Sequence, residues 1–139
     1  MLPKEEIKEG NLLMSNLPEI YIIDDDKLLL KLLSAALKDV GKITTFNNEE
    51  EGLEKVITDR PGLVILDLNL PHINGDELMV KFSEAKIFQT TQIILLTGQD
   101  ISDTKRMSLC TLGFAATLQK SEGADRVVQV VKETIEEYL

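Results

Sequence analysis

Short apolar runs and amphipathic segments alternate along this chain from residue 19 onward. Five mainly apolar runs lie at 20–23, 43–46, 63–66, 93–96 and 114–118. Runs of this length that are bounded by polar or turn-forming residues are typical of strands. The run at 63–66 shows no polar alternation, which predicts a strand covered on both faces.

Segments with helical spacing follow these runs. Asp26 stands where an N-cap belongs, Gly41 where the first helix should end, and Asn47 or Asn48 before a second helix through roughly residue 58. Three further helices are expected after residue 75, over 101–112 and around 127–138. The side chains expected on the buried faces of the first two helices are Leu28, Leu29, Leu32, Leu33, Ala36 and Leu37, then Leu53, Val56 and Ile57.

Five strand–helix pairs predict an α/β fold, in which a parallel sheet is covered by helices on both faces through right-handed crossovers. We assign Phe46, Phe82 and Phe114 to its core. In sheets of this kind, ligands bind outside the carboxyl ends of the strands, where the strand order reverses. Chemically active side chains are therefore expected at those ends.

Polar side chains stand at four of the predicted strand ends. Asp24 and Asp25 follow the first strand, Asp67 the third and Thr97 the fourth, and Lys120 comes shortly after the fifth. Carboxylates suit Mg²⁺, and an aspartate can also attack phosphorus to give an acyl phosphate. A hydroxyl and an ammonium group can contact phosphoryl oxygens. The pattern therefore predicts a site for a metal ion and a phosphoryl group.

Three other polar residues have structural interpretations. Asp26 is interpreted as a helix cap, since negative charge is favourable at a helix N-terminus. His72 is expected to be an exposed loop residue. Cys110 is expected to be a half-buried helix residue without a redox role.

Composition narrows the functional classes. The 139 residues are 43% apolar and 28% charged, which suits one globular domain. Twenty-four acidic side chains against 15 basic ones give a net charge of −9, which argues against a direct nucleic-acid partner. No apolar stretch reaches the roughly 20 residues of a membrane span, and no secretory signal pattern is present. The single cysteine cannot form a disulfide within the chain, which fits a reducing compartment. We therefore expect a cytoplasmic protein that makes no contact with a membrane.

Residues 1–18 differ from the rest of the chain. They are charged and interrupted by Gly10 and Pro18. We expect a partly flexible leader over 1–18, followed by a single domain over 19–139.

Taken together, the motifs resemble the receiver domain of two-component response regulators, the CheY-like family. They are Ile-Ile-Asp-Asp-Asp at 22–26, Leu-Asp-Leu-Asn-Leu-Pro at 66–71 with Gly75, Leu-Thr-Gly at 96–98, and Lys120. The resemblance covers about residues 19–139, and the motifs arrive in the family's order. It implies a five-stranded, doubly wound sheet of flavodoxin-like order 2-1-3-4-5.

The resemblance also implies a phosphorelay role for the acidic residues. Asp67 would accept a phosphoryl group in Mg²⁺-dependent signal transduction. Asp25 and Asp67 would ligate Mg²⁺ directly, and Asp24 would act through water. The backbone carbonyl of Asn69 would complete the metal site.

Thr97 and Lys120 would then contact the phosphoryl oxygens, and a protein-binding surface formed by the last two strands and their helices would rearrange. On this reading the chain is a phosphoryl acceptor that assists its own phosphorylation and dephosphorylation, and is not an enzyme in the usual sense. The implied partners are a sensor histidine kinase or a phosphotransfer protein, a downstream protein target and, as one option, a second copy in a homodimer.

Two positions depart from the family's pattern. The residue after the lysine is usually proline and is here Ser121. Since a non-proline cis bond costs roughly 3 kcal/mol, we expect a trans bond or a shifted loop. The position three before the lysine is usually an aromatic switch residue and is here Thr117. The alternative is therefore a receiver-fold module that binds proteins without switching.

Three other classes fit the sequence poorly. A phosphohydrolase that forms a phospho-aspartate normally has a second acid two residues after the nucleophile, and Asn69 stands there. A calcium loop starting at Asp67 fails at Pro71. No glycine-rich nucleotide-binding motif is present.

Overall fold

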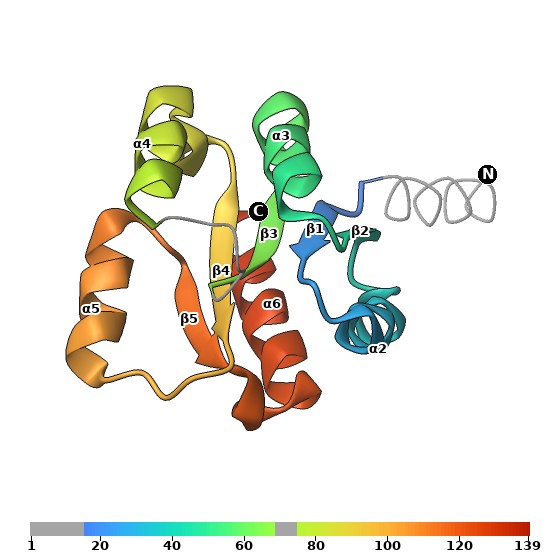
Figure 1. The fold of residues 1–139 in the computed structure, drawn as a ribbon. Coiled ribbons are helices and arrows are strands. Elements are labelled where there is room, and N and C mark those ends of the chain that lie inside the picture. Colours follow the sequence, from blue (N-terminus) through green and yellow to red (C-terminus); the bar gives the residue numbers. More distant parts are fainter. Residues whose placement is uncertain (1–15, 69–74) are drawn as a thin grey trace.

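The computed structural model describes residues 16–68 and 75–139, and its strands form one twisted sheet (Figure 1). All neighbouring strands are parallel, in the order β2-β1-β3-β4-β5. The predicted fold class, strand directions and strand order are therefore confirmed. The strands are β1 (Glu19–Ile23), β2 (Lys42–Phe46), β3 (Leu63–Asp67), β4 (Gln92–Thr97) and β5 (Ala116–Gln119).

Within the described residues, five α-helices connect or follow the strands: α2 (Lys27–Leu37), α3 (Glu49–Asp59), α4 (Gly75–Ala85), α5 (Asp103–Leu112) and α6 (Ala124–Tyr138). Two short 3₁₀ helices, η1 (Ile87–Gln89) and η2 (Lys120–Glu122), were not predicted. Of the expected leader, only 16–18 falls within the described residues. Within the described part of the chain, no helix combines the length and the apolar character that crossing a membrane requires.

The two faces of the sheet pack against different helices. Ile22 and Ile65 belong to the apolar cluster that contains the buried apolar residues of α2 and α6. Ile23 and Leu66 belong to the opposite cluster, with buried residues of α3, α4 and α5. This division follows from the strand geometry, because successive side chains of a strand point to opposite faces. The core thus has two layers, separated by the sheet.

Two of the predicted helix caps are confirmed. The carboxylate of Asp26 accepts hydrogen bonds from the backbone N–H groups of Leu28 and Leu29, at 3.0 and 3.1 Å. Of the two candidate asparagines, Asn48 is the cap of α3, and its side chain accepts from the Glu51 N–H at 2.9 Å. Each cap satisfies N–H groups that have no partner inside the helix.

The face of α2 that packs on the sheet agrees only in part with the predicted one. Leu33 and Leu37 are buried as predicted, and Leu30 is buried as well, whereas Leu28 and Leu32 are 75% and 50% exposed. Leucines surround most of this helix, so its spacing fits more than one apolar stripe. Packing against the sheet and α6 selects the stripe, and helical spacing alone cannot.

Gly41 does not terminate α2 as predicted. The helix ends at Leu37 with Lys38 as a right-handed cap residue. Gly41 is instead required by space, because a Cβ there would lie 2.5 Å from Ile20 Cδ1 and 2.7 Å from the Pro18 carbonyl oxygen. The glycine lets the chain enter β2 close against the start of β1.

Strand β5 begins later than predicted, so Phe114 precedes it. Phe114 is still buried, and its ring lies edge-on to Phe88 with centroids 5.1 Å apart. Phe82 is buried as predicted, and Phe46 is partly buried against the same cluster. The aromatic core assignments are therefore correct, although one strand boundary is not.

The strand order reverses between β1 and β3. From β1 the chain passes through α2 to β2 on one side, and the next strand, β3, pairs with β1 on the other side. The helices leaving β1 and β3 therefore cover opposite faces and leave a crevice above the carboxyl ends of these strands.

Candidate phosphoryl and metal site

The predicted site residues meet at the carboxyl edge of the sheet. Asp67 and Thr97 are the last residues of β3 and β4, Asp24 and Asp25 follow β1, and Lys120 follows β5. One carboxylate oxygen from each of the three aspartates lies within 4.8 Å of the other two. The fold thus brings Asp67 close to two carboxylates that precede it by more than 40 residues in the chain.

Most of this site is inaccessible to solvent. Asp24, Asp67 and Thr97 are only 1%, 3% and 3% exposed, whereas Asp25 is exposed. Buried carboxylates must be compensated by hydrogen bonds or opposite charge. Asp25 therefore marks the side of the site that opens to solvent.

Lys120 supplies the compensating charge. Its Nζ lies 3.0 Å from Asp24 Oδ2 and 3.2 Å from Asp67 Oδ2. The backbone N–H of Asp26 donates to Asp24 Oδ1 at 2.9 Å, which fixes the orientation of that carboxylate. Asp24 Oδ2 is buried and accepts no hydrogen bond of good geometry. Its lone pairs are available to a cation or to a water bound to one.

These contacts shift the pKa of both partners. Burial raises the pKa of the Asp24 carboxyl, the Asp26 N–H and Lys120 oppose this rise, and the charge of Asp67 adds to it. Burial by itself would lower the pKa of Lys120. The hydrogen bonds and negative charges of Asp24 and Asp67 outweigh burial, so the pKa of Lys120 is raised. Lys120 is therefore held as a cation between two carboxylates.

The chemistry of the donor set fits a hard divalent cation. Mg²⁺ prefers oxygen ligands and takes few protein carboxylates, keeping several waters. Asp24, Asp25 and Asp67 offer such oxygens, one of them on the exposed side. The predicted fourth donor, Asn69, lies outside the described residues, as do Pro71 and His72.

The peptide bond after Lys120 is trans, as is every other peptide bond in the described residues. This is one of the two expected outcomes for Ser121. Lys120 nevertheless reaches both carboxylates, because η2 turns the chain directly after β5. A proline is therefore not needed to bring the lysine to this site.

Sequence reasoning missed three polar residues beside Lys120: Arg106, Gln119 and Glu122. The Gln119 side chain accepts a hydrogen bond from the Ile101 N–H at 2.9 Å, and the Glu122 side chain accepts from the Gln119 N–H at 2.7 Å. The only sequence signal was a polar residue, Gln119, at the end of an apolar strand.

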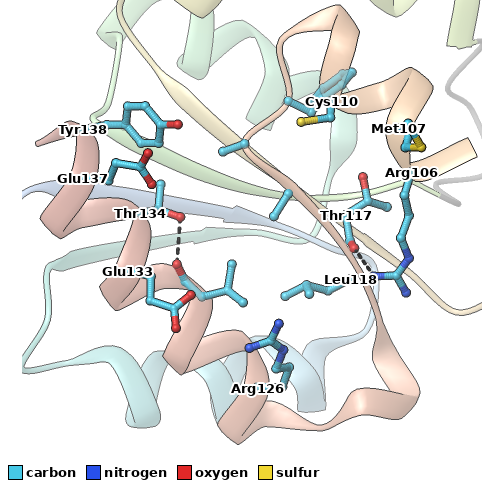
Figure 2. A pocket seen from close by; sticks show the side chains of 14 residues that line it. Arg106, Met107, Cys110, Thr117, Leu118, Arg126, Glu133, Thr134, Glu137 and Tyr138 are labelled. Atoms are coloured by element: carbon cyan, nitrogen blue, oxygen red, sulfur yellow. Dashed lines mark hydrogen bonds between the residues drawn. The ribbon is translucent and has the colours of Figure 1, made fainter. Parts of the chain in front are cut away.

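An open pocket of about 420 Å³ lies beside β5, between α5 and α6 (Figure 2). Arg106 and Arg126 lie near one end, and Glu133, Glu137 and Tyr138 lie near the other. We call the pocket and its rim the β5 pocket. It also contains Cys110, which is exposed and not half-buried as predicted, because α5 presents it to solvent beside the uncovered edge of the sheet.

The fold and the site together define a doubly wound α/β protein whose acidic, lysine-bridged crevice lies at the switch point of the sheet. Comparison of the sequence with known families identifies the class: the profile of the response regulator receiver domain matches residues 20–132. The chain belongs to this family, whose members act in two-component signalling.

Curated relatives agree with this assignment. The chain is 30% identical over 92 residues to the alkaline phosphatase synthesis transcriptional regulatory protein PhoP of Bacillus subtilis, covering 66% of this chain and 38% of PhoP. It is 34% identical over 87 residues to the response regulator ArlR of Staphylococcus aureus, covering 62% of this chain and 37% of ArlR. The chain thus matches well under half the length of these relatives.

Solved structures show the same fold. A CheY-like response regulator receiver domain protein from Methanospirillum hungatei superimposes with a TM-score of 0.74 at 24% identity, covering 88% of this chain and 97% of that one. Receiver domains bind Mg²⁺ at an acidic pocket, interact with histidine kinases and downstream effectors, and are not enzymes in the usual sense. Because PhoP is described as a transcriptional regulatory protein, the absence of a nucleic-acid partner stays a prediction.

Proposed function

We propose that this chain is a receiver that is phosphorylated at Asp67 with Mg²⁺ bound and that signals by changing a protein-binding surface. The observation that carries the proposal is the meeting of Asp24, Asp25 and Asp67 with the Lys120 ammonium in one crevice. Three carboxylates at this distance repel one another unless cations intervene. The site is thus suited to a metal ion and to the charge of a phosphoryl group.

In the proposed reaction, an Asp67 carboxylate oxygen attacks the phosphorus of a phosphohistidine or of a small phosphodonor. A P–O bond forms as the P–N bond to the histidine, or the bond to the small leaving group, breaks. The leaving imidazole takes a proton from solvent, and Asp67 becomes an acyl phosphate. Hydrolysis by water returns the aspartate and inorganic phosphate. Phosphoryl transfer of this kind depends on positioning and charge neutralisation.

Each neighbouring residue has a role in this scheme. Asp25 and Asp67 would hold Mg²⁺ directly, with Asp24 acting through water and Asn69 through its backbone carbonyl. When bound, the ion neutralises charge on the phosphoryl oxygens. Lys120 lies 3.2 Å from Asp67 and can turn from the bare carboxylate to the phosphoryl oxygens. Thr97, at the end of the adjacent strand, supplies a hydroxyl donor to the same oxygens.

The proposal extends to the setting of the domain. The phosphodonor would be a sensor histidine kinase or a phosphotransfer protein, and the output would be contact with a downstream protein or a second copy through the β5 pocket. We place the receiver at residues 19–139, after a leader, in the cytoplasm. Its own residues would assist both phosphorylation and dephosphorylation.

The test is amide NMR of the chain with Mg²⁺ and beryllofluoride, a phosphoryl mimic, compared with Asp67→Asn. We expect beryllofluoride to shift amides around Asp67 and Thr97, and to shift amides lining the β5 pocket. Asp67→Asn should lose the response to the mimic, since the amide oxygen cannot bond beryllium as a carboxylate does. Glu136→Gln, which removes one exposed charge on α6, serves as the control and should respond like the wild type.

Equal responses of the wild type and Asp67→Asn would remove Asp67 from its assigned role. The alternative, a protein-binding module that does not switch, is favoured by Thr117 and Ser121 in place of the aromatic residue and the proline. It predicts that Mg²⁺ and beryllofluoride shift amides at the site but leave those of the β5 pocket unchanged.

A further inference from the structure

The two departures from the family's pattern, Thr117 and Ser121, flank a polar network. Gln119, the last residue of β5, lies between them and pairs in register with Thr97 of β4. It also precedes Lys120 directly in the chain. Gln119 is thus adjacent to both residues that would contact the phosphoryl group.

The Gln119 side chain connects the segment after β4 to the segment after Lys120. Its oxygen accepts a hydrogen bond from the Ile101 N–H at 2.9 Å. Its amide nitrogen lies 3.4 Å from Asp100 Oδ1 and 3.4 Å from Ser121 Oγ. One amide group therefore contacts both the segment after β4 and the turn after β5.

Glu122 and Arg106 close the network around η2. The Glu122 carboxylate accepts from the Gln119 N–H at 2.7 Å and holds the ends of the turn that contains Lys120. Arg106 donates to the Thr117 carbonyl at 3.0 Å, a bond drawn in Figure 2, and its second nitrogen lies 3.4 Å from Gln119 Oε1 and 3.5 Å from Glu122 Oε2.

We infer that Gln119 and Glu122 position Lys120 in the site, and that Arg106 carries a change there to the β5 pocket. This inference rests on the proposed function. The network occupies the place where the family's pattern has a proline and an aromatic residue. Its two short bonds, at 2.7 and 2.9 Å, fix the turn. Its longer contacts, at 3.4 and 3.5 Å, can exchange partners, which a two-state element requires.

The route from the site to the surface is continuous. Thr97 Oγ1 now accepts a hydrogen bond from the Gln99 N–H at 3.1 Å. When this hydroxyl turns to a phosphoryl group, that N–H loses its acceptor and the segment leading to Ile101 is released. The Ile101–Gln119 bond then changes, and Arg106, which lines the β5 pocket, moves with Gln119.

Gln119→Leu tests the positioning role, because it keeps the side-chain volume and removes the amide. A displaced Lys120 no longer competes with Mg²⁺ for Asp24 and Asp67, so Mg²⁺ should bind more tightly. Beryllofluoride at saturating Mg²⁺ should bind more weakly, since it loses its ammonium partner. We expect changes of up to about tenfold in opposite directions, the effect of one charged hydrogen bond. Titrations followed by amide NMR measure both affinities.

The side-chain NMR signal of Lys120, assigned by its loss in Lys120→Arg, gives an independent readout without metal or mimic. In Gln119→Leu it should move toward the position of an exposed lysine. If Gln119→Leu does not fold, Glu122→Ala serves as the second variant, because its position is exposed. It should show the same changes in both affinities and in the Lys120 signal.

Arg106→Gln should keep the site response and lose the shifts at the β5 pocket, whereas Lys105→Gln, on the same helix, should keep both.

Wild-type affinities and an unmoved Lys120 signal in folded Gln119→Leu would overturn the inference. A parallel loss of both affinities would do the same, because it indicates general damage to the site. If the wild type itself does not bind beryllofluoride, the proposed function fails. The Lys120 signal and the Mg²⁺ titration still decide the positioning role in that case.

Discussion

Lys120 lies where a cation must compensate two buried carboxylates in the metal-free protein. Its Nζ contacts both Asp24 and Asp67, and its side chain is 27% exposed. The ammonium therefore stabilises the fold, and it would compete with Mg²⁺ for the same oxygens at the proposed metal site. These two effects have opposite consequences when the lysine is removed.

Lys120→Met should destabilise the metal-free protein by about 1–3 kcal/mol, because buried carboxylates lose their partner. The same change should tighten Mg²⁺ binding and weaken beryllofluoride binding. Urea unfolding in the presence of a chelator, with metal titration, measures the first two effects. Lys132→Met, at an exposed position on α6, is the matched control. Looser Mg²⁺ binding in Lys120→Met would contradict the competition.

At the scale of elements, a side-chain hydrogen bond of the buried Tyr21 links β1 to the end of α3. The hydroxyl of Tyr21 donates to Asp59 Oδ2 at 2.5 Å, on the face of the sheet that α3, α4 and α5 cover. The hydrogen bond to Asp59, together with burial and the negative charges of Asp59 and Glu19, raises the pKa of Tyr21 from 10.0 to about 12. The bond thus favours the protonated phenol in the folded state.

Tyr21→Phe should lower the free energy of unfolding by about 1.5 kcal/mol at neutral pH, as expected for a hydrogen bond to a charged group. Because the folded pKa is raised, the wild type keeps this advantage below pH 10.0 and loses it as the pH rises toward 12. Urea unfolding of both proteins across that range measures the difference. A difference that grows with pH would contradict the assignment.

The tyrosinate absorbance gives a direct check on the same pair. The chain has two tyrosines, Tyr21 and Tyr138. Tyr138 is exposed, although its neighbour Glu137 also raises its pKa. Tyr21→Phe should remove the component that titrates near pH 12.

At the scale of the whole molecule, the proposed metal site can form only in the folded chain, since Asp24 follows β1 and Asp67 ends β3. A ligand that binds only the folded state stabilises it by mass action. Mg²⁺ at a hundred times its dissociation constant should therefore add about 2.7 kcal/mol to the free energy of unfolding.

Asp25→Asn should lose most of that stabilisation while leaving the metal-free protein nearly unchanged, because Asp25 is exposed. Glu50→Gln, which removes one charge from an exposed position on α3, should keep it. Thermal unfolding with Mg²⁺ and with a chelator separates the two variants. An equal Mg²⁺ effect in both would place the ion elsewhere.

Much of this molecule could be predicted from local sequence. Hydrophobic patterning located five strands and five helices to within a few residues, and Asp26 and Asn48 were correct as caps. These features depend on neighbours within a few positions. The acidic site could also be predicted, since parallel strands bring their carboxyl ends to one edge. The family's motifs added the strand order.

The tertiary structure alone decided which leucines of α2 are buried, because several stripes of that helix are apolar. It alone brought Gln119, Arg106 and Glu122 together around Lys120. Each of these polar residues is inconspicuous in the sequence, since their contacts join segments up to 19 residues apart through side-chain direction and loop path. The spacing of residues along the sequence specifies neither the side-chain direction nor the path of the loops. Patterning thus determined the elements and the location of the site, and packing determined how its lysine is held.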